Sequence, residues 1–319
     1  MALVLVEVAA TARAVPHPRP LRREPSPPGI TEDVRPAERD RLVHTATWAR
    51  STVRAPSEGF FYRRLSTSNV RIENSFVPVE GVGERTEQRL WERGITHWDE
   101  FEPDALGPTT GRRVQQFISE GRERLDRGDA RFFGSAFPSE HVWRLYENFR
   151  EAAAFFDIET TGLSKDRDQV TTVTVHAGGE TRTFVAERDP YVGEPLTLEA
   201  VRETLCEAPL LVTFNGKRFD VPFLEAELGC TLDAPHVDLL YPCRQLGLTG
   251  GLKPIERELG IDRGQDIDGR EAVRLWHAYR DGEDGALERL VEYNRDDTVN
   301  LQTLMEVVAN RLHDERVPR

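Results

Sequence analysis

The chain has 319 residues, 38% of them hydrophobic, and a formal net charge of −13. This length accommodates two modest domains or one domain with a long extension. No stretch approaches the roughly 20 consecutive apolar residues of a membrane span, so we expect no membrane partner. The opening MALVLVEVAA lacks a basic leader and is interrupted by Glu7, which argues against a signal peptide. Three cysteines without CxxC spacing favour reduced thiols in a cytoplasmic protein over a disulfide framework or a zinc site.

The basic residues are unusual, because lysine occurs only at Lys165, Lys217 and Lys253 and the other 39 of the 42 basic residues are arginine. An acid-rich, lysine-poor chain is typical of proteins that work in high salt, where screening weakens self-repulsion. We therefore expect a halophilic protein, although a GC-rich genome produces the same arginine bias. The overall acidity consequently does not argue against nucleic-acid binding, which would depend on a local basic groove.

Residues 1–65 have a different composition from the rest. The stretch VPHPRPLRREPSPPG is rich in proline and arginine and has no hydrophobic period, which predicts a disordered tail. Residues 1–55 contain nine arginines and six acidic residues, a net +3, so the remainder carries −16. A basic tail could contact nucleic acid, but a misassigned start codon would produce the same composition.

Residues 66–150 are expected to form a small helical module. Gly81 and Gly83 flank Val82 and precede an amphipathic run with Leu90 and Trp91. The next apolar positions are Ile95, Trp98 and Phe101. Their helical spacing predicts a second short helix. A glycine turn that opens a helix exposes backbone N–H groups suited to a phosphate.

This segment resembles a helix-hairpin-helix unit, a module that grips the DNA backbone without sequence preference, with the Gly81–Gly83 turn as its hairpin. The stretch LGPTTGRRVQQFI (106–118) could be a degenerate second copy. An ordinary glycine-turned helix pair without a ligand is the alternative.

Residues 151–319 alternate between strand and helix patterns. Apolar or alternating runs predict five strands, at 152–159, 169–177, 180–187, 210–215 and 235–240. Gly178 and Gly179 separate the second and third strands and indicate a hairpin. Helices are predicted at 196–208 and 220–228, and then to about residue 312 with breaks at 250–251 and 280–285. A hairpin followed by crossover helices gives an α/β domain with a mixed five-stranded sheet flanked by helices.

Four carboxylates and one tyrosine stand out within this part of the chain. Asp157 and Glu159 are two residues apart, as on one face of a strand, and Tyr293 and Asp297 are four apart, as on one face of a helix. Asp220 lies between the two pairs, at the end of FNGKRFD. Grouped carboxylates repel one another unless cations neutralise them, and Mg²⁺ or Mn²⁺ prefers oxygen ligands. Two such ions about 4 Å apart serve displacement at phosphorus.

Any one of these motifs is weak evidence, because most acidic residues are solvated surface charges. Together, DIETTGL, NGKRFD, HVDLL, GGLKPIERELGI and YNRDDTVNL resemble the DEDD, DnaQ-like 3′–5′ exonuclease superfamily of the ribonuclease H-like fold. The resemblance covers roughly residues 70–315 and is greatest to the YprB-like group of predicted prokaryotic exonucleases. It implies that the five residues above are catalytic and that the four carboxylates bind two ions. Tyr293 implies the tyrosine subclass, because Glu292 stands where the sister subclass has histidine.

The resemblance also assigns finer roles. Asp157 would bridge both ions, Glu159 would bind the more exposed one, and Asp220 would hold the second through water. Asp297 would complete the first ion's shell, and Tyr293 would orient the attacking water. Helical geometry only leans towards Asp297 over its neighbour Asp296, and the family's Tyr-x-x-x-Asp spacing selects Asp297.

Substrate contacts are expected from residues near these motifs, each with a structural alternative. Thr160, Thr161 and Gly162 could contact the terminal nucleotide or form an ordinary turn, and Leu163 resembles a wedge against the last base. Asn215 could hold substrate or cap a helix. Lys217 and Lys253 could grip phosphate or be solvated. We interpret His236 and Asp238 as part of the sheet structure. Gly81 and Gly83 in the hairpin are the remaining residues that we expect to contact nucleic acid.

The sequence therefore predicts a two-ion Mg²⁺- or Mn²⁺-dependent 3′–5′ exonuclease acting on single-stranded or 3′-ended DNA or RNA, without a nucleotide cofactor. A role in DNA repair would suit such an enzyme. The alternatives are a structure-selective endonuclease or a ribonuclease on the same fold, or an accessory protein that binds nucleic acid. The choice between DNA and RNA stays open, because it depends on contacts near the 2′-hydroxyl.

Overall fold

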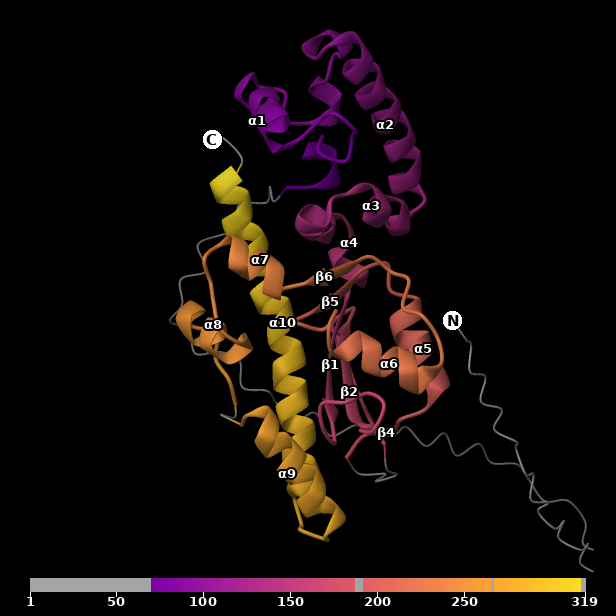
Figure 1. Cartoon of the computed structure of the whole chain (residues 1–319), viewed down its shortest axis with the longest axis vertical. Coiled ribbons are helices and arrows are strands. Elements are labelled where there is room, and N and C mark those ends of the chain that lie inside the picture. Colours follow the sequence, from indigo (N-terminus) through magenta and orange to yellow (C-terminus); the bar gives the residue numbers. More distant parts are fainter. Residues whose placement is uncertain (1–69, 187–191, 265–266, 317–319) are drawn as a thin grey trace, which may run out of the picture. The chain divides into compact units, whose positions relative to one another are not determined.

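The computed structural model describes residues 70–186, 192–264 and 267–316 (Figure 1). The predicted disordered tail, residues 1–65, lies outside the described residues. In the part that the structure describes, no helix combines the length and apolar character needed to cross a lipid bilayer.

Residues 70–152 contain helices and short 3₁₀ turns and no strand (Figure 1). Its elements are η1 (Ile72–Asn74), α1 (Glu84–Glu92), η2 (Trp98–Glu100), η3 (Pro103–Ala105), α2 (Pro108–Asp126), α3 (Ala130–Ala136), η4 (Ser139–Leu145), α4 (Tyr146–Phe149) and η5 (Arg150–Ala152). A buried ion pair joins α1 to η4, because Arg144 Nη1 lies 2.9 Å from Glu87 Oε2 and both side chains are at most 2% exposed. Glu87 also accepts hydrogen bonds from the backbone N–H groups of Phe76 and Val77. This one carboxylate therefore holds the turn that leads to α1 against η4.

The second short helix expected around Trp98 is a single 3₁₀ turn, η2. The Glu100 side chain accepts the backbone N–H groups of Thr96 and His97, which closes the turn locally. Phe101 is already extended, and Pro103 follows two residues later. The apolar spacing reflects three contacts with the core and not a helix.

A six-stranded mixed sheet follows, in the order β4-β3-β2-β1-β5-β6. Its strands are β1 (Ala154–Thr160), β2 (Val170–Ala177), β3 (Glu180–Val185), β4 (Glu194–Pro195), β5 (Leu211–Thr213) and β6 (His236–Asp238). β1, β2 and β3 pair antiparallel, with the predicted turn at Gly178 and Gly179, both at positive φ. β5 and β6 continue the sheet in parallel from β1. The expected mixed α/β architecture is confirmed, but the expected number of strands, five, is wrong because β4 adds a two-residue edge strand.

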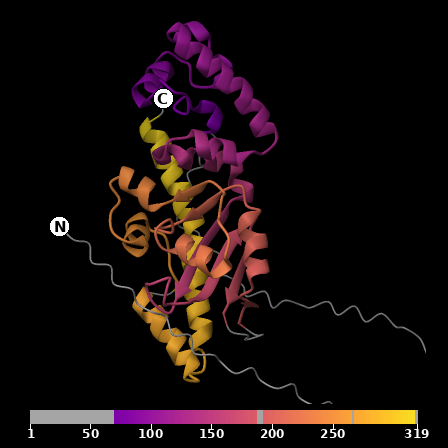
Figure 2. The ribbon, with the colours of Figure 1, turned by 45° about the vertical axis from the view of Figure 1, so that its right-hand side comes forward.

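Helices cover both faces of the sheet (Figures 1 and 2). The remaining helices are α5 (Leu198–Cys206), α6 (Asp220–Leu228), α7 (Leu240–Gln245), α8 (Leu252–Leu259), α9 (Gly269–Arg280) and α10 (Ala286–Arg316). Side chains alternate along β1. Phe155 accordingly packs in the core with Leu301 and Leu304 of α10, whereas Phe156 packs with Leu224 of α6 on the opposite face. The odd-numbered side chains of β1, which include both of its acidic residues, therefore face α10.

Candidate active site

Asp157 and Glu159 lie in the second half of β1, on the face that α10 covers. The pairing of β1 with β2 shifts register between Glu159 and Thr160. Such bulges re-aim side chains and end regular pairing, and they are frequent next to active sites. The strand thus presents two carboxylates side by side immediately before its regular pairing breaks.

Tyr293 and Asp297 lie one turn apart on α10, as their spacing predicted. One carboxylate oxygen each from Asp157, Glu159 and Asp297 lie within 4.8 Å of one another. Asp297 is only 6% exposed, and the Tyr293 hydroxyl donates a hydrogen bond to its carboxylate. The fold therefore brings Asp297 to two acidic groups that lie about 140 residues before it in the chain.

Asp220 occupies the first position of α6 and is 4% exposed. Its Oδ1 accepts a hydrogen bond from the backbone N–H of Ile158, at 3.2 Å, between the two acidic residues of β1. Asp220 is not part of the three-residue group within 4.8 Å, although it lies beside it. The expected role of Asp220, which is to hold a second ion through water, stays a prediction.

Lys253 and Arg263 offset only part of the negative charge of the carboxylates at the site. Burial, and then the negative charges of Asp220, Glu159 and Asp297, raise the pKa of Asp157 well above its usual value. Burial and the neighbouring carboxylates also raise the pKa of Glu159 well above its usual value, while Lys253 opposes this shift. Burial raises the pKa of Asp220 to about 7. Burial and the adjacent carboxylates raise the pKa of the Tyr293 hydroxyl, which therefore stays protonated and remains a donor.

This donor set fits a hard divalent cation. Carboxylate oxygens are the ligands that Mg²⁺ and Mn²⁺ prefer, and a cation would remove the repulsion that raises these pKa values. Asp157, Glu159 and Asp297 are the residues whose oxygens lie close enough to share such an ion.

Asp296 points elsewhere than its neighbour. Its Oδ2 accepts a hydrogen bond from the backbone N–H of Gly264, at 3.2 Å, in the loop between α8 and α9. Asp296 therefore anchors a loop, whereas Asp297 joins the carboxylate group.

Two side chains of the site have no clear signal in the sequence. Asn294 is fully buried on α10, and its Nδ2 donates to Asp157 Oδ2 at 2.7 Å. Arg263 comes from the loop after α8 and forms ion pairs with both Asp297 and Glu256. Residue 294 lies one turn before Asp297, but this spacing does not indicate its partners on β1 and β2. Arg263 lies in an irregular segment, where no periodicity indicates the direction of a side chain.

The expected substrate contacts at the end of β1 occupy a short, ordered turn. The Thr160 hydroxyl donates to the carbonyl oxygen of Gly162, and a Cβ atom at Gly162 would lie 2.6 Å from the Asp168 carboxylate. Asp168 in turn accepts the backbone N–H of Ser164 at 2.8 Å. Leu163 at the tip is 87% exposed. The turn thus holds an apolar side chain out in solvent next to the carboxylates.

The other expected contacts lie on different elements. Asn215 follows β5 with a φ of +64°, and Lys217 lies two residues later. Lys253 lies in the first turn of α8, with its Nζ 4.8 Å from the centre of the Tyr293 ring. This Nζ is buried and has no hydrogen-bond partner among the described residues. Lys253 is therefore brought to the carboxylate group, whereas Gly81 and Gly83 lie in the helical segment before α1.

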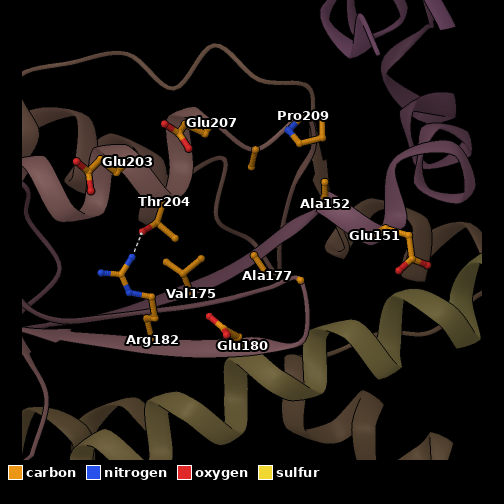
Figure 3. Close-up of a pocket in the computed structure, with 12 residues that line it drawn as sticks. Glu151, Ala152, Val175, Ala177, Glu180, Arg182, Glu203, Thr204, Glu207 and Pro209 are labelled. Carbon is orange, nitrogen blue, oxygen red and sulfur yellow. Dashed lines mark hydrogen bonds between the residues drawn. The ribbon is translucent and has the colours of Figure 1, made fainter. Parts of the chain in front are cut away.

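A separate hollow in the described surface lies away from this site (Figure 3). It has a volume of about 500 Å³ and lies where β1 begins and the β2–β3 hairpin turns. Glu180, Glu203 and Glu207 line it together with Arg182, whose guanidinium donates to Thr204 Oγ1. The carboxylate group lies in the second half of β1, so the two features are at different ends of the strand.

Comparisons with known proteins agree with this description of the fold. Residues 154–309 match the family model described as the RNase_H superfamily. No curated protein matches the chain significantly.

Solved structures similar to the chain include nucleases and a polymerase, each with a TM-score of 0.37. One is described as the apo form of the nuclease, with 20% identity over 57% of this chain and 81% of that one. Another is Brucella melitensis NrnC bound to pGG, with 22% identity over 54% and 79%. A third is the family B DNA polymerase of the archaeon Pyrobaculum calidifontis, with 18% identity over 50% and 27%. From the family match, residues 154–309 form an RNase_H-superfamily domain with a ribonuclease H-like fold.

Proposed function

We propose that the chain is a divalent-metal-dependent nuclease that removes nucleotides one at a time from the 3′ end of a nucleic acid. The observation that carries this proposal is the meeting of Asp157, Glu159 and Asp297 within 4.8 Å inside an RNase_H-superfamily domain. Two bound Mg²⁺ or Mn²⁺ ions would supply an activated water and neutralise charge on the attacking and leaving oxygens. The tyrosine-type DEDD subclass and its YprB-like group are part of the same proposal.

The chain's own residues would bind and orient the reactants. Asp157, Glu159 and Asp297 would hold the ions, and Asp220 would contribute from behind them. Tyr293 stays protonated and donates its single hydroxyl proton to Asp297, so its hydroxyl oxygen would accept a hydrogen bond from the attacking water and align it. Lys253 brings a positive charge whose Nζ has no partner among the described residues, which suits a phosphate oxygen.

Residues around the cluster would hold the terminal nucleotide. Thr160 and Gly162 form the turn after β1, and the exposed Leu163 would pack against the last base. Asn215 would contact the strand from the loop after β5. Leu163 is 87% exposed at the tip of this turn, so its side chain is free to pack against a base.

The helical segment would grip the phosphate backbone. Gly81 has a φ of +93°, and a Cβ atom there would lie 3.6 Å from Thr110 Oγ1 of α2, so the first turns of α1 and α2 are neighbours. Their N-caps are Gly83 and Gly107, which have no side chain to accept a hydrogen bond from the first turn of the helix. Backbone N–H groups at two adjacent helix ends are suited to anionic oxygens. These features support the helix-hairpin-helix interpretation.

Cleavage of labelled oligonucleotides tests the catalytic proposal. Single- and double-stranded DNA and RNA carrying a 5′ label would be incubated with Mg²⁺ or Mn²⁺ in high salt. A ladder that shortens by one nucleotide from the 3′ end is expected. Asp297→Asn should lower the rate by about 100-fold or more, the scale on which loss of one charge-stabilising group acts.

The matched control is Asp296→Asn, which changes the adjacent carboxylate that binds Gly264. It should keep most of the activity. Cuts within the strand would favour an endonuclease, and equal effects of the two substitutions would contradict the proposed metal site.

Backbone binding is tested separately in an Asp157→Asn background that cannot cleave. Gly81→Ala forces a side chain onto a positive φ next to α2, and Gly94→Ala does so at a φ of +82° where no atom lies within 4 Å. Only Gly81→Ala should weaken DNA binding and reduce its salt dependence. Equal binding by both variants would argue against the hairpin.

A further inference from the structure

The Asp157 carboxylate is connected to the interior by a line of buried polar side chains. Asn294 Nδ2 donates to Asp157 Oδ2 at 2.7 Å. Thr174 and Thr172 both donate from their hydroxyls to Asn294 Oδ1, at 2.6 and 3.2 Å. The Thr174 hydroxyl also lies 2.9 Å from that of Thr183.

The direction of each hydrogen bond follows from the number of protons available. A carboxylate can only accept, so the Asn294 amide must turn its nitrogen towards Asp157 and its oxygen towards the threonines. The single hydroxyl proton of Thr174 is used on Asn294, so Thr183 must donate to Thr174. Thr183 therefore donates to Thr174, Thr174 donates to Asn294, and Asn294 donates to Asp157. This order allows a single orientation of the Asn294 amide.

These groups are placed by the sheet register. Thr174 is the cross-strand partner of both Asp157 on β1 and Thr183 on β3, and Thr172 is the partner of Glu159. Partners share a face of the sheet, so the row faces α10, where Asn294 lies. Asn294, Thr172 and Thr174 are fully buried, so water does not compete for these bonds.

We propose that Asn294 is a positioning residue that fixes the Asp157 carboxylate for cation binding, with Thr174 and Thr172 holding the amide in place. Asn294 binds one oxygen of Asp157 and leaves the other for the ion. Without this bond, repulsion from Glu159 and Asp297 would favour rotation of the carboxylate away from the cluster. The inference rests on the proposed metal site, and it assigns a role to a residue between Tyr293 and Asp297 that has no role in the expected catalytic set.

The test measures Mn²⁺ affinity of the full chain by the electron paramagnetic resonance signal of free Mn²⁺, which requires no nucleic acid. Asn294→Ala should weaken Mn²⁺ binding by about 10- to 100-fold, as loss of a group that orients a metal ligand typically does. Thr174→Val, which keeps the side-chain shape and removes the hydroxyl, should cause a smaller loss.

Thr171→Val is the matched control. Thr171 lies next to Thr172 on the same strand, is 1% exposed and has a hydroxyl without a hydrogen-bond partner among the described residues. Its substitution should leave Mn²⁺ affinity unchanged. A folded Asn294→Ala protein with wild-type affinity overturns the proposal. If Asn294→Ala does not fold, equal affinities of Thr174→Val and Thr171→Val overturn it.

Parallel cleavage assays separate this inference from the proposed function. Asp157-dependent nuclease activity together with unchanged Mn²⁺ binding in Asn294→Ala would refute only the role of Asn294. Mn²⁺ binding that depends on Asp157 and Asn294, without any cleavage, would refute only the nuclease. Absence of Mn²⁺ binding by the unmodified chain would overturn the inference itself.

Discussion

The backbone N–H of Asn215 donates to the Asp238 carboxylate at 2.6 Å, and this bond joins the end of β5 to the end of β6. Asn215 has a φ of +64°, a left-handed conformation that no other non-glycine residue in the described ranges adopts. The same carboxylate accepts the backbone N–H groups of Lys217 and Leu240, each at 3.2 Å. Asp238 therefore shapes the loop that leads to Asp220.

Asp238→Ala is expected to destabilise this loop. Three backbone donors around a buried side chain would lose their acceptor, at a cost of about 1–3 kcal/mol each if water does not replace it. Cleavage should fall as well, because Asp220 is reached through this loop. Denaturant unfolding and initial rates measure the two effects. Asp233→Ala, at an exposed position shortly before β6, should change neither, and similar behaviour of the two variants would refute the role of Asp238.

The stability of the metal-free chain should depend on pH through the buried carboxylates. The folded-state pKa of Asp220 is about 7 against an ordinary value of 3.8, so the folded chain binds more protons than the unfolded chain between these pH values. The free energy of unfolding therefore decreases as pH rises from about 4 to about 7, by at most about 4 kcal/mol from this group. Asp157 and Glu159 act in the same direction.

Thermal unfolding at pH 5 and pH 8, with and without Mn²⁺, measures this effect. Mn²⁺ should raise Tm more at pH 8, because only the charged carboxylates bind it. Asp220→Asn should flatten the pH dependence of the metal-free chain. A Tm gain from Mn²⁺ that is larger at pH 5 would be incompatible with this account.

The buried ion pair between Glu87 and Arg144 should be essential for the helical segment. Arg144→Met leaves the Glu87 carboxylate buried without its partner, which costs about 3–5 kcal/mol. Adding Glu87→Gln should recover part of the loss, since the amide oxygen can still accept the N–H of Phe76. Denaturant unfolding measures both variants, with Arg122→Met as a control in an exposed ion pair, worth less than about 1 kcal/mol. If the double variant recovers no stability, the unpaired charge of the Glu87 carboxylate is not the cause of the destabilisation by Arg144→Met.

Leu163→Ser tests the role of the exposed side chain after β1. The free energy of unfolding should change by less than about 0.5 kcal/mol, because Leu163 is 87% exposed. If the side chain packs against the terminal base, the lost burial is worth about 1.5–3 kcal/mol, or roughly a ten- to hundredfold rise in KM. Val299→Ser is the control, since Val299 is exposed on α10 about 200° around the helix from Asp297. An unchanged KM in Leu163→Ser would remove the wedge from the proposal.

The sequence predicted the parts of the site that lie on regular elements. Asp157 and Glu159 follow the period of a strand, and Tyr293 and Asp297 follow the period of a helix, so their shared faces could be inferred. Asn294 was missed because its partners, Thr172 and Thr174, are set by the pairing of β1 with β2. That register depends on contacts between strands, which no local pattern records.

The irregular parts of the chain were less predictable. Arg263 reaches Asp297 from the loop after α8, and the sequence carried no break signal for that loop beyond Gly260 and Gly264. The edge strand β4 contains a proline and only two residues, too few for an alternating pattern. Glu100 closes a turn where apolar spacing alone suggested a helix. In each case a single tertiary or side-chain contact decided the conformation.

The length of α10 sets the distance between the carboxylates and the start of α1. Arg316, at its end, donates to Glu84, which directly follows the Gly83 N-cap of α1. Nineteen residues of helix separate Arg316 from Asp297, a rise of about 28 Å. At about 3.4 Å per nucleotide along one strand, this corresponds to roughly eight nucleotides. If the Gly81–Gly83 turn binds the backbone as proposed, a stacked strand would need about that length to contact both the turn and the carboxylates. KM plotted against substrate length should then fall up to about eight nucleotides and change little beyond it.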